Sequence, residues 1–280
     1  MRPHISFSEL SSFANECQHR WKLDYLENKR SNKFSVHFDF GTAIHEALEK
    51  HYTRKDPITT PEAVQVFKDK FSKLTSENGP FYPKKLPVKD YVEMLVAGER
   101  ILNHFDECEE LKDAEVVHNE FALFEDIELH GDIQMKFKGY IDVIIKSKDK
   151  RGNNILWICD FKTCSWGWDR DTRSDQWKHF QLFLYKYFIC KKFNIDPKQV
   201  RTAFVLLKKR PPKGSHPIEF FPVSAGPVSV QRSLDALSGN VSEMVAREKN
   251  NSFKKDRSFC TSKYGERCPY LDTNFCTKDD

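Results

Sequence analysis

Two neighbouring segments rich in β-branched and aromatic residues carry the charged side chains best suited to chemistry. Asp142 lies in residues 137–146, and Asp160 and Lys162 lie in residues 155–163. The polar run between these segments is typical of a turn, so the sequence predicts a β-hairpin. Because side chains alternate between the two faces of a strand, Asp160 and Lys162 face the same side.

The predicted hairpin brings two carboxylates close together. A turn centred near Arg151 sets Asp142 opposite Asp160, although a register shifted by one residue stays open. Clustered carboxylates repel one another, and a cation between them offsets that repulsion. A hard divalent metal such as Mg²⁺ or Mn²⁺ prefers oxygen ligands and can activate water. Lys162 beside it would stabilise the negative charge that develops on a phosphoryl group.

Each of these residues also has an ordinary explanation. An Asp-x-Lys pair on a strand is often a solvated ion pair that contributes little to stability. Asp142 in its apolar strand can cap a neighbouring turn. The metal-site hypothesis therefore depends on the three residues acting together. Glu120, on the preceding predicted strand, is a further candidate for the acidic patch.

A helical pattern opens the chain. Ser6 followed three residues later by Glu9 fits a capping box at a helix start. Apolar residues then recur at helical spacing as far as Tyr25. The sequence predicts one helix of about 20 residues, with Cys17 on its apolar face.

The rest of the chain alternates between helical and strand patterns. A second helix is predicted from Thr42 to beyond Tyr52, with His45 and Glu49 on one side of it. The other predicted elements are a mostly helical region over 55–115, strands at 116–124, 201–209 and 219–225, and helices from about 174 to 193 and over 227–250. This mixture indicates an α/β protein.

Three of the eight cysteines crowd into the C-terminal tail. They are Cys260, Cys268 and Cys276. Three thiolates make an incomplete four-ligand site, so a fourth ligand has to come from elsewhere in the chain. Structural zinc sites usually contain two short ligand pairs, and this spread trio fits a [4Fe–4S] cluster better, with zinc as the alternative.

Composition narrows the class of protein. The chain has 280 residues, of which 39% are hydrophobic and 31% are charged, as is typical of globular proteins. The formal net charge of +4 is low for a protein that coats nucleic acid, although a local groove can still be basic. We find neither an apolar stretch of membrane-helix length nor a secretory signal, and we expect a cytoplasmic protein without membrane contact.

The hairpin residues resemble a known family. The pattern Gly-Tyr-Ile-Asp142 followed by Asp160-Phe161-Lys162 resembles the PD-(D/E)XK nuclease superfamily, and more narrowly its RecB/AddB-type exonucleases and their CRISPR-associated relatives. Further motifs agree in their order along the chain, namely the N-terminal helix with Cys17, Gly-Thr-Ala-Ile-His45, Gln181-x-x-x-Tyr185 and the C-terminal cysteines. Ile141 stands where the family name has proline, whose side chain carries no chemistry.

The resemblance implies a fold and a set of site residues. The implied fold is a restriction-endonuclease-like α/β core, with a mixed central β-sheet flanked by helices and the termini joined by a cysteine-ligated cluster. The implied ligands of Mg²⁺ or Mn²⁺ are His45, Asp142, Asp160 and the backbone carbonyl of Phe161. Lys162 is the implied catalytic lysine, and Gln181 and Tyr185 would organise the active site or contact DNA. The implied cluster ligands are Cys17, Cys260, Cys268 and Cys276.

The resemblance also implies a function. Residues 1–280 would form a single nuclease domain, with an N-terminal cysteine helix (1–30), a helical region (31–115), a nuclease core (116–250) and a cluster-binding segment (251–280). The domain would act as a metal-dependent DNA exonuclease on single-stranded or frayed ends, in DNA recombination, repair or phage DNA metabolism. A helicase or a recombinase is the candidate partner.

The alternative function is a DNA-end binding module with a structural Fe–S or zinc site and little catalysis. Asp160 and Lys162 are the residues that such a module would be expected to have lost, and both are present. Cleavage polarity, the choice between DNA and RNA, and the choice between exonuclease and endonuclease stay open at the level of sequence.

Overall fold

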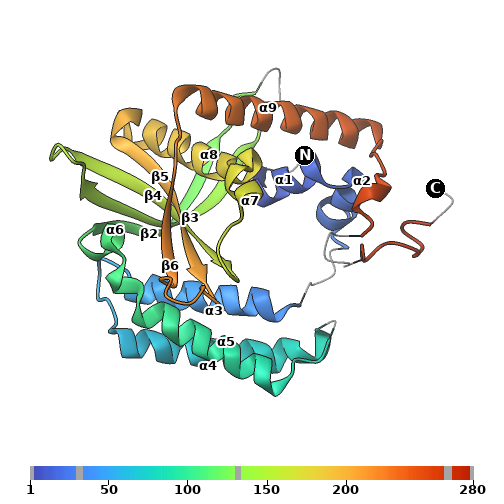
Figure 1. The fold of residues 1–280 in the computed structure, drawn as a ribbon. Helices are drawn as coiled ribbons and strands as arrows, with labels where there is room; N and C mark the ends of the chain where they lie inside the picture. The colour runs from blue at the N-terminus through green and yellow to red at the C-terminus, as the bar shows by residue number, and fades with distance from the viewer. Residues whose placement is uncertain (1–2, 30–33, 83, 130–133, 262–266, 278–280) are drawn as a thin grey trace. The chain divides into compact units, whose positions relative to one another are not determined.

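The computed structural model describes residues 3–29, 34–82, 84–129, 134–261 and 267–277 (Figure 1). The chain divides into two compact units. The larger unit comprises Lys33–Leu123 and Tyr140–Val230, and the smaller unit comprises Met1–Asn32, Phe124–Gly139 and Gln231–Asp280. Across the described ranges, no helix combines the length and the apolar character needed to cross a membrane.

A mixed β-sheet forms the centre of the larger unit. Its strands lie side by side in the order β3 (Lys136–Lys148), β4 (Asn154–Cys164), β5 (Val200–Lys208) and β6 (Ile218–Val223), and β2 (Glu115–Asp126) also pairs with β3. The β3–β4 and β5–β6 pairs are antiparallel, whereas β4 and β5 are parallel. The predicted mixed sheet is confirmed.

The β3–β4 hairpin has the predicted register. Val143 pairs with Cys159 at the end of the ladder. The same register continued by one residue sets Asp142 opposite Asp160. Beyond the last pair, the backbone N–H of Phe161 donates a hydrogen bond to the Asp142 carboxylate. The two carboxylates therefore lie where the backbone pairing of the two strands stops.

Helices cover both faces of this sheet (Figure 1). One face packs against α3 (Val36–His51), α4 (Thr60–Asn78) and α5 (Val88–Asn103). The helix α8 (Gln176–Phe193) packs against β4 and β5. Short helices complete the larger unit, namely η2 (Gly79–Phe81), η3 (Phe105–Glu107), α6 (Glu109–Lys112), α7 (Arg170–Ser174) and η4 (Pro197–Gln199).

Buried phenylalanines hold α3 and α4 together and determine how closely α5 approaches. The rings of Phe40, Phe67 and Phe71 are fully buried, with centroids 5.4 to 6.0 Å apart. Gly98 of α5 lies so close to the Phe67 ring that an added Cβ would meet it at 2.1 Å. A glycine is therefore required for this approach, and the packing fixes the position of α3 over the sheet.

The smaller unit gathers the two ends of the chain. It contains β1 (His4–Ser6), α1 (Phe7–Asn15), α2 (Gln18–Trp21), the π-helical turn η1 (Lys22–Leu26), most of α9 (Pro227–Asn250) and η5 (Arg257–Phe259). β1 pairs in parallel with the first residues of β3. The Tyr270 hydroxyl donates to Asp24 at 2.6 Å, so residues distant in sequence are joined here.

The predicted single N-terminal helix is wrong. The helical run breaks at Glu16 and Cys17, whose backbones are extended. Cys17 therefore lies at the junction of α1 and α2 and not on the apolar face of one helix, and its Sγ accepts the backbone N–H of Asp256 at 3.4 Å. The apolar spacing hides the break, because Trp21 beyond it is still fully buried.

The other predicted elements are confirmed with small shifts of their ends. The helix predicted to start at Thr42 begins instead at Val36, because the Ser35 hydroxyl caps it by accepting the N–H of His37 at 3.3 Å. The last predicted helix, 227–250, coincides with α9. The strand predicted at 201–209 is β5, displaced by one residue.

Candidate active site

Asp142 contacts residues from two other elements of the larger unit. Its Oδ1 lies 3.6 Å from Nδ1 of His45 on α3. Its Oδ2 accepts the backbone N–H of Phe161 on β4 at 2.5 Å. The Asp142 side chain is 13% exposed and that of His45 is 30% exposed, so both are partly accessible from solvent.

Asp160 and Lys162 form an ion pair that α8 supports. Lys162 Nζ lies 2.6 Å from Asp160 Oδ2, and Asp160 is almost fully buried. Gln181 bridges the pair, because its Oε1 accepts from Lys162 Nζ at 3.2 Å while its Nε2 donates to Asp160 Oδ1 at 2.9 Å. The same Nε2 lies 3.0 Å from the Tyr185 hydroxyl one turn further along α8.

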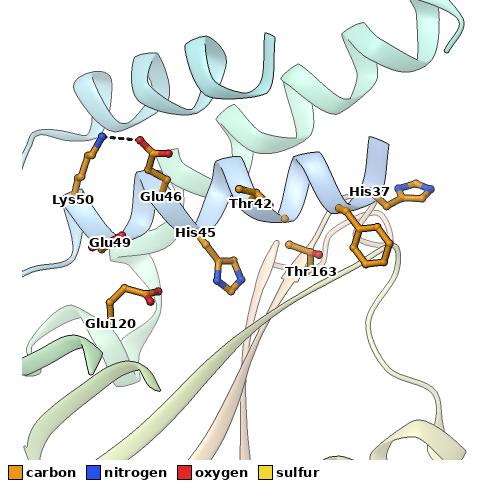
Figure 2. Close-up of a pocket in the computed structure, with 10 residues that line it drawn as sticks. His37, Thr42, His45, Glu46, Glu49, Lys50, Glu120 and Thr163 are labelled. Carbon is orange, nitrogen blue, oxygen red and sulfur yellow. Dashed lines mark hydrogen bonds and ion pairs between the residues drawn. The ribbon is translucent and has the colours of Figure 1, made fainter. Parts of the chain in front are cut away.

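Glu120 on β2 completes a group of three metal-type donors. Glu120, His45 and Asp142 each offer one ligand atom, and these atoms lie within 4.8 Å of one another, which makes them the one such group in the described part of the chain. Glu120 has a φ of 47°, a left-handed conformation that costs a residue with a Cβ roughly 1–2 kcal/mol. Figure 2 shows its carboxylate pointing toward His45.

Burial and crowding shift the pKa values of the charged groups. Burial raises the pKa of Asp160 to about 6, although the ammonium of Lys162 opposes the rise. Burial alone would lower the pKa of Lys162, but Asp160 outweighs it, and the pKa is raised. Burial lowers the pKa of His45, but the Asp142 and Asp160 carboxylates together raise it, and it ends above its ordinary value. Burial, with Asp142 next, raises the pKa of Glu120.

A pocket of about 640 Å³ opens beside these donors. Figure 2 shows that α3 forms one wall, with His37, His45 and Glu49 along it, and that Glu120 and Thr163 face that wall. Thr163 directly follows Lys162 on β4. The pocket is large enough for a phosphodiester group to approach His45 and Glu120.

The donor set fits a divalent metal ion. Two carboxylates and one imidazole are ligand types found around Mg²⁺, Mn²⁺ and related ions. The neighbouring Asp160 Oδ2 is buried and, within the described ranges, has no hydrogen-bond partner apart from its ion-pair contact with Lys162. Because Lys162 already compensates this carboxylate, the fit to a metal ion rests on the three gathered donors.

The four predicted cluster cysteines all lie in the smaller unit. Burial raises the pKa of the Cys260 thiol, and the next contributions come from Cys268, Cys276 and Cys17, so the four thiols are electrostatic neighbours. The N–H of Cys268 donates to the carbonyl of Cys260 at 2.8 Å. Among the placed residues, no three of these thiols lie within 4.8 Å of one another.

The structure brings the sequence-predicted site residues into two adjoining groups. His45 and Asp142 lie with Glu120 in the donor group, whereas Asp160 contacts Lys162 and Gln181. The sequence does not predict the left-handed backbone conformation of Glu120, because glutamate rarely adopts it. The pocket residues His37 and Thr163 were not predicted, and the only signal for Thr163 is its place after Lys162.

Comparison with known proteins agrees with this arrangement. The model of the PD-(D/E)XK nuclease superfamily matches residues 4–273, which is nearly the whole chain. A search of curated proteins finds no match. The matched range contains His45, Asp142 and the Asp160–Lys162 pair, and the mixed sheet flanked by helices is consistent with a restriction-endonuclease-like core. The chain belongs to the PD-(D/E)XK nuclease superfamily.

Proposed function

We propose that the protein is a metal-dependent DNA exonuclease that acts on single-stranded or frayed ends. The observation that carries the proposal is the donor group of His45, Glu120 and Asp142 beside the Asp160–Lys162 ion pair. Membership of a nuclease superfamily supports phosphodiester hydrolysis. The motif resemblance to RecB/AddB-type enzymes supports the narrower exonuclease activity.

The metal would be held by residues from four elements, α3, β2, β3 and β4. His45, Glu120 and Asp142 supply the gathered donors, and Asp160 with the carbonyl of Phe161 are the ligands that the resemblance adds. When bound, Mg²⁺ or Mn²⁺ would polarise a phosphoryl oxygen and lower the pKa of a bound water. Because an imidazole binds metal in its neutral form, metal binding at His45 would compete with protonation, and the raised pKa of His45 strengthens that competition.

Lys162 would act as the catalytic lysine. Its raised pKa keeps the ammonium charged at neutral pH, and Asp160 and Gln181 hold it in place. A fixed ammonium would stabilise the negative charge that develops as water attacks phosphorus, and would orient that water. The Tyr185 hydroxyl accepts a hydrogen bond from the side-chain amide of Gln181, so we assign Tyr185 the role of positioning Gln181.

The substrate and setting are inferred from chemistry and resemblance. Trp166, shortly after β4, is 64% exposed and available to stack on a base, whereas Trp168 packs against Phe204 with centroids 4.8 Å apart. A single strand offers unstacked bases for such a contact. We place the enzyme in the cytoplasm, in DNA recombination, repair or phage DNA metabolism, with a helicase or a recombinase supplying the strand.

The cysteines of the smaller unit would bind a [4Fe–4S] cluster. Four thiolates at about 2.3 Å from one zinc ion would lie about 3.8 Å from each other. The described cysteine thiols are neighbours but are not gathered so tightly. The preference for an iron–sulfur cluster over zinc rests on the motif resemblance and on the spread of the three tail cysteines along the sequence, with Cys17, Cys260, Cys268 and Cys276 as ligands.

The activity is tested with two forms of one DNA. An end-labelled linear single strand and a circular single strand of the same sequence are incubated with cluster-loaded protein and Mg²⁺ or Mn²⁺. We expect degradation of the linear strand alone, and none in EDTA. Cleavage of the circle would contradict the exonuclease and indicate an endonuclease. Binding of the linear DNA without cleavage would favour the DNA-end binding module.

A further inference from the structure

A second pocket in the larger unit is lined by basic side chains. It has a volume of about 280 Å³ and is bounded by α5, by Ser165 after β4 and by the residues that follow β5. Its basic residues are Arg100, Lys209 and Arg210. Glu93 is the carboxylate among the lining residues, and it lies 2.7 Å from Arg210. The lining therefore carries more positive than negative charge.

Lys209 is the most unusual group in this pocket. The residue is only 7% exposed, yet it makes no ion pair with a carboxylate in the described part of the chain. Its Nζ lies 3.2 Å from Nδ1 of His37, and burial lowers its pKa. A lysine this deeply buried is rarely left without an anion, because desolvation of the ammonium is costly.

The preceding residue provides a direct contrast. Lys208 is 8% exposed, almost the same as Lys209. Its Nζ lies 3.1 Å from the carboxylate of Glu219, so its charge is compensated within the protein. Two adjacent lysines are thus equally buried, and only the one that lines the basic pocket lacks a protein carboxylate.

Arg100 is a second basic side chain of this pocket that could contact an anion. One of its terminal nitrogens donates to the carbonyl of Lys209 at 2.5 Å, which joins α5 to the residue after β5. Its Nε is buried and has no hydrogen-bond partner among the residues that the structure describes. Lys209 Nζ also lies 5.4 Å from the centroid of the Phe40 ring, but neither this ring nor His37 supplies a carboxylate. A guanidinium beside an ammonium that lacks a protein carboxylate suits a phosphate.

The basic pocket adjoins the candidate active site. His37 lines both pockets. Thr163 lines the first and Ser165 lines the second, and these residues lie two positions apart, about 7 Å along an extended chain. Figure 2 shows His37 near the start of the helix that carries His45. A strand that reached the metal donors could therefore extend into the basic pocket.

We propose that the Lys209 pocket binds a backbone phosphate of the substrate strand, next to the phosphate placed at the metal donors. This assignment rests on the proposed nuclease function and deepens it, because the second phosphate would fix the direction and register of the strand. Val92 and Val96 also line the pocket and are exposed, so they offer apolar contact to the attached sugar or base.

Binding of a short single-stranded oligonucleotide in EDTA tests the assignment without cleavage. Wild type, Lys209→Gln, Lys209→Arg and the matched control Lys208→Gln are titrated at several salt concentrations. We expect Lys209→Gln to bind about 5- to 10-fold more weakly, and its salt dependence to fall by about 0.7 in slope, as for one lost phosphate contact on a single strand. Lys209→Arg should retain most of the affinity, and Lys208→Gln should bind as wild type does.

Unchanged affinity and slope in Lys209→Gln would overturn the phosphate assignment. If that variant does not fold, Arg210→Gln replaces it, since Arg210 is half-exposed and lines the same pocket. Wild-type cleavage with Mg²⁺ is measured in parallel. If wild type cleaves DNA and the variants bind DNA normally, only the phosphate assignment at Lys209 is wrong. If wild type neither binds nor cleaves DNA, the proposed nuclease function is wrong as well.

Discussion

The metal donors and the cysteines represent two opposite ways of building a site. His45, Glu120 and Asp142 come from three elements of the larger unit, and their ligand atoms already lie within 4.8 Å of one another. The cysteines of the smaller unit sit at a helix junction and in a tail with little regular structure, and their thiols are less tightly gathered. The first group is already gathered by packing in the folded chain, whereas the proposed cluster would draw the four thiols together.

The energetic consequences also differ. Burial, together with the crowding of carboxylates where β3 and β4 stop pairing, lowers stability, as the raised pKa values of Asp160 and Glu120 indicate. The proposed cluster would tie Cys17 to the C-terminal tail, and because it would close a very long loop it would stabilise the folded chain. We therefore expect mutations in the first site to remove activity and mutations in the second to remove stability.

The largest expected effect is on cleavage when Asp142 is changed. Asp142→Asn removes a charge that the metal donors share, and we expect cleavage to fall by on the order of 10³-fold or more with little loss of stability. Asp113→Asn, at an exposed position directly after α6, is the matched control and should cleave as wild type does. Cleavage by Asp142→Asn within tenfold of wild type would remove Asp142 from the site.

The corresponding change in the smaller unit should act on stability. Cys268→Ala removes a proposed cluster ligand, and we expect a loss of at least about 3 kcal/mol in the free energy of unfolding, together with loss of the visible absorbance of the cluster. Cys164→Ala, at a half-buried position of the larger unit, serves as control. Equal melting temperatures for Cys268→Ala and wild type, both prepared with metal, would contradict the stabilising role.

Asp160 should make the metal-free protein sensitive to pH. Its pKa is raised from 3.8 to about 6 in the folded state, so the folded state holds the proton more tightly than the unfolded state. The free energy of unfolding should therefore fall as pH rises from about 4 to about 6, by roughly 3 kcal/mol for a shift of about two pKa units. Urea unfolding in EDTA across this range should show the fall in wild type and a smaller one in Asp160→Asn. Identical pH dependence in the two proteins would contradict this account.

The smallest expected effect concerns Glu120. Glu120→Gln should weaken Mn²⁺ binding by about 10- to 100-fold, because one donor loses its charge while the backbone is retained. Glu49→Gln is a close control, since Glu49 lines the same pocket but lies outside the donor group. Calorimetric titration of both variants with Mn²⁺ distinguishes them, and equal affinities would place Glu120 outside the metal site.

Local sequence patterns predicted the hairpin and its register well. The polar turn between the two apolar segments sets the hairpin register, and the observed pairing of Val143 with Cys159 follows from it. The helical spacing around His45 was equally informative, because Ile44, Ala47 and Leu48 are fully buried. Motif order along the chain then indicated the family that the match over residues 4–273 shows.

Long-range and backbone features could not be predicted in the same way. The break at Cys17 is invisible because helical spacing resumes at Trp21. The left-handed backbone at Glu120 depends on the surrounding fold, and the bridge from Gln181 to Asp160 and Lys162 depends on how α8 packs on the sheet. Lys209 and Lys208 are both buried, but only Lys208 has a carboxylate partner. The sequence alone cannot predict this difference between two adjacent lysines.

Cleavage of an end-labelled single strand by wild type and Lys162→Ala tests the central claim most directly. Lys148→Ala, at the exposed end of β3, controls for loss of a lysine from the same sheet. With Mg²⁺ or Mn²⁺, wild type and Lys148→Ala should degrade the strand, while Lys162→Ala should fold, melt at a lower temperature because buried Asp160 loses its ion-pair partner, and leave the strand intact. Metal-dependent cleavage by folded Lys162→Ala at the wild-type rate would contradict the assignment of catalysis to this site.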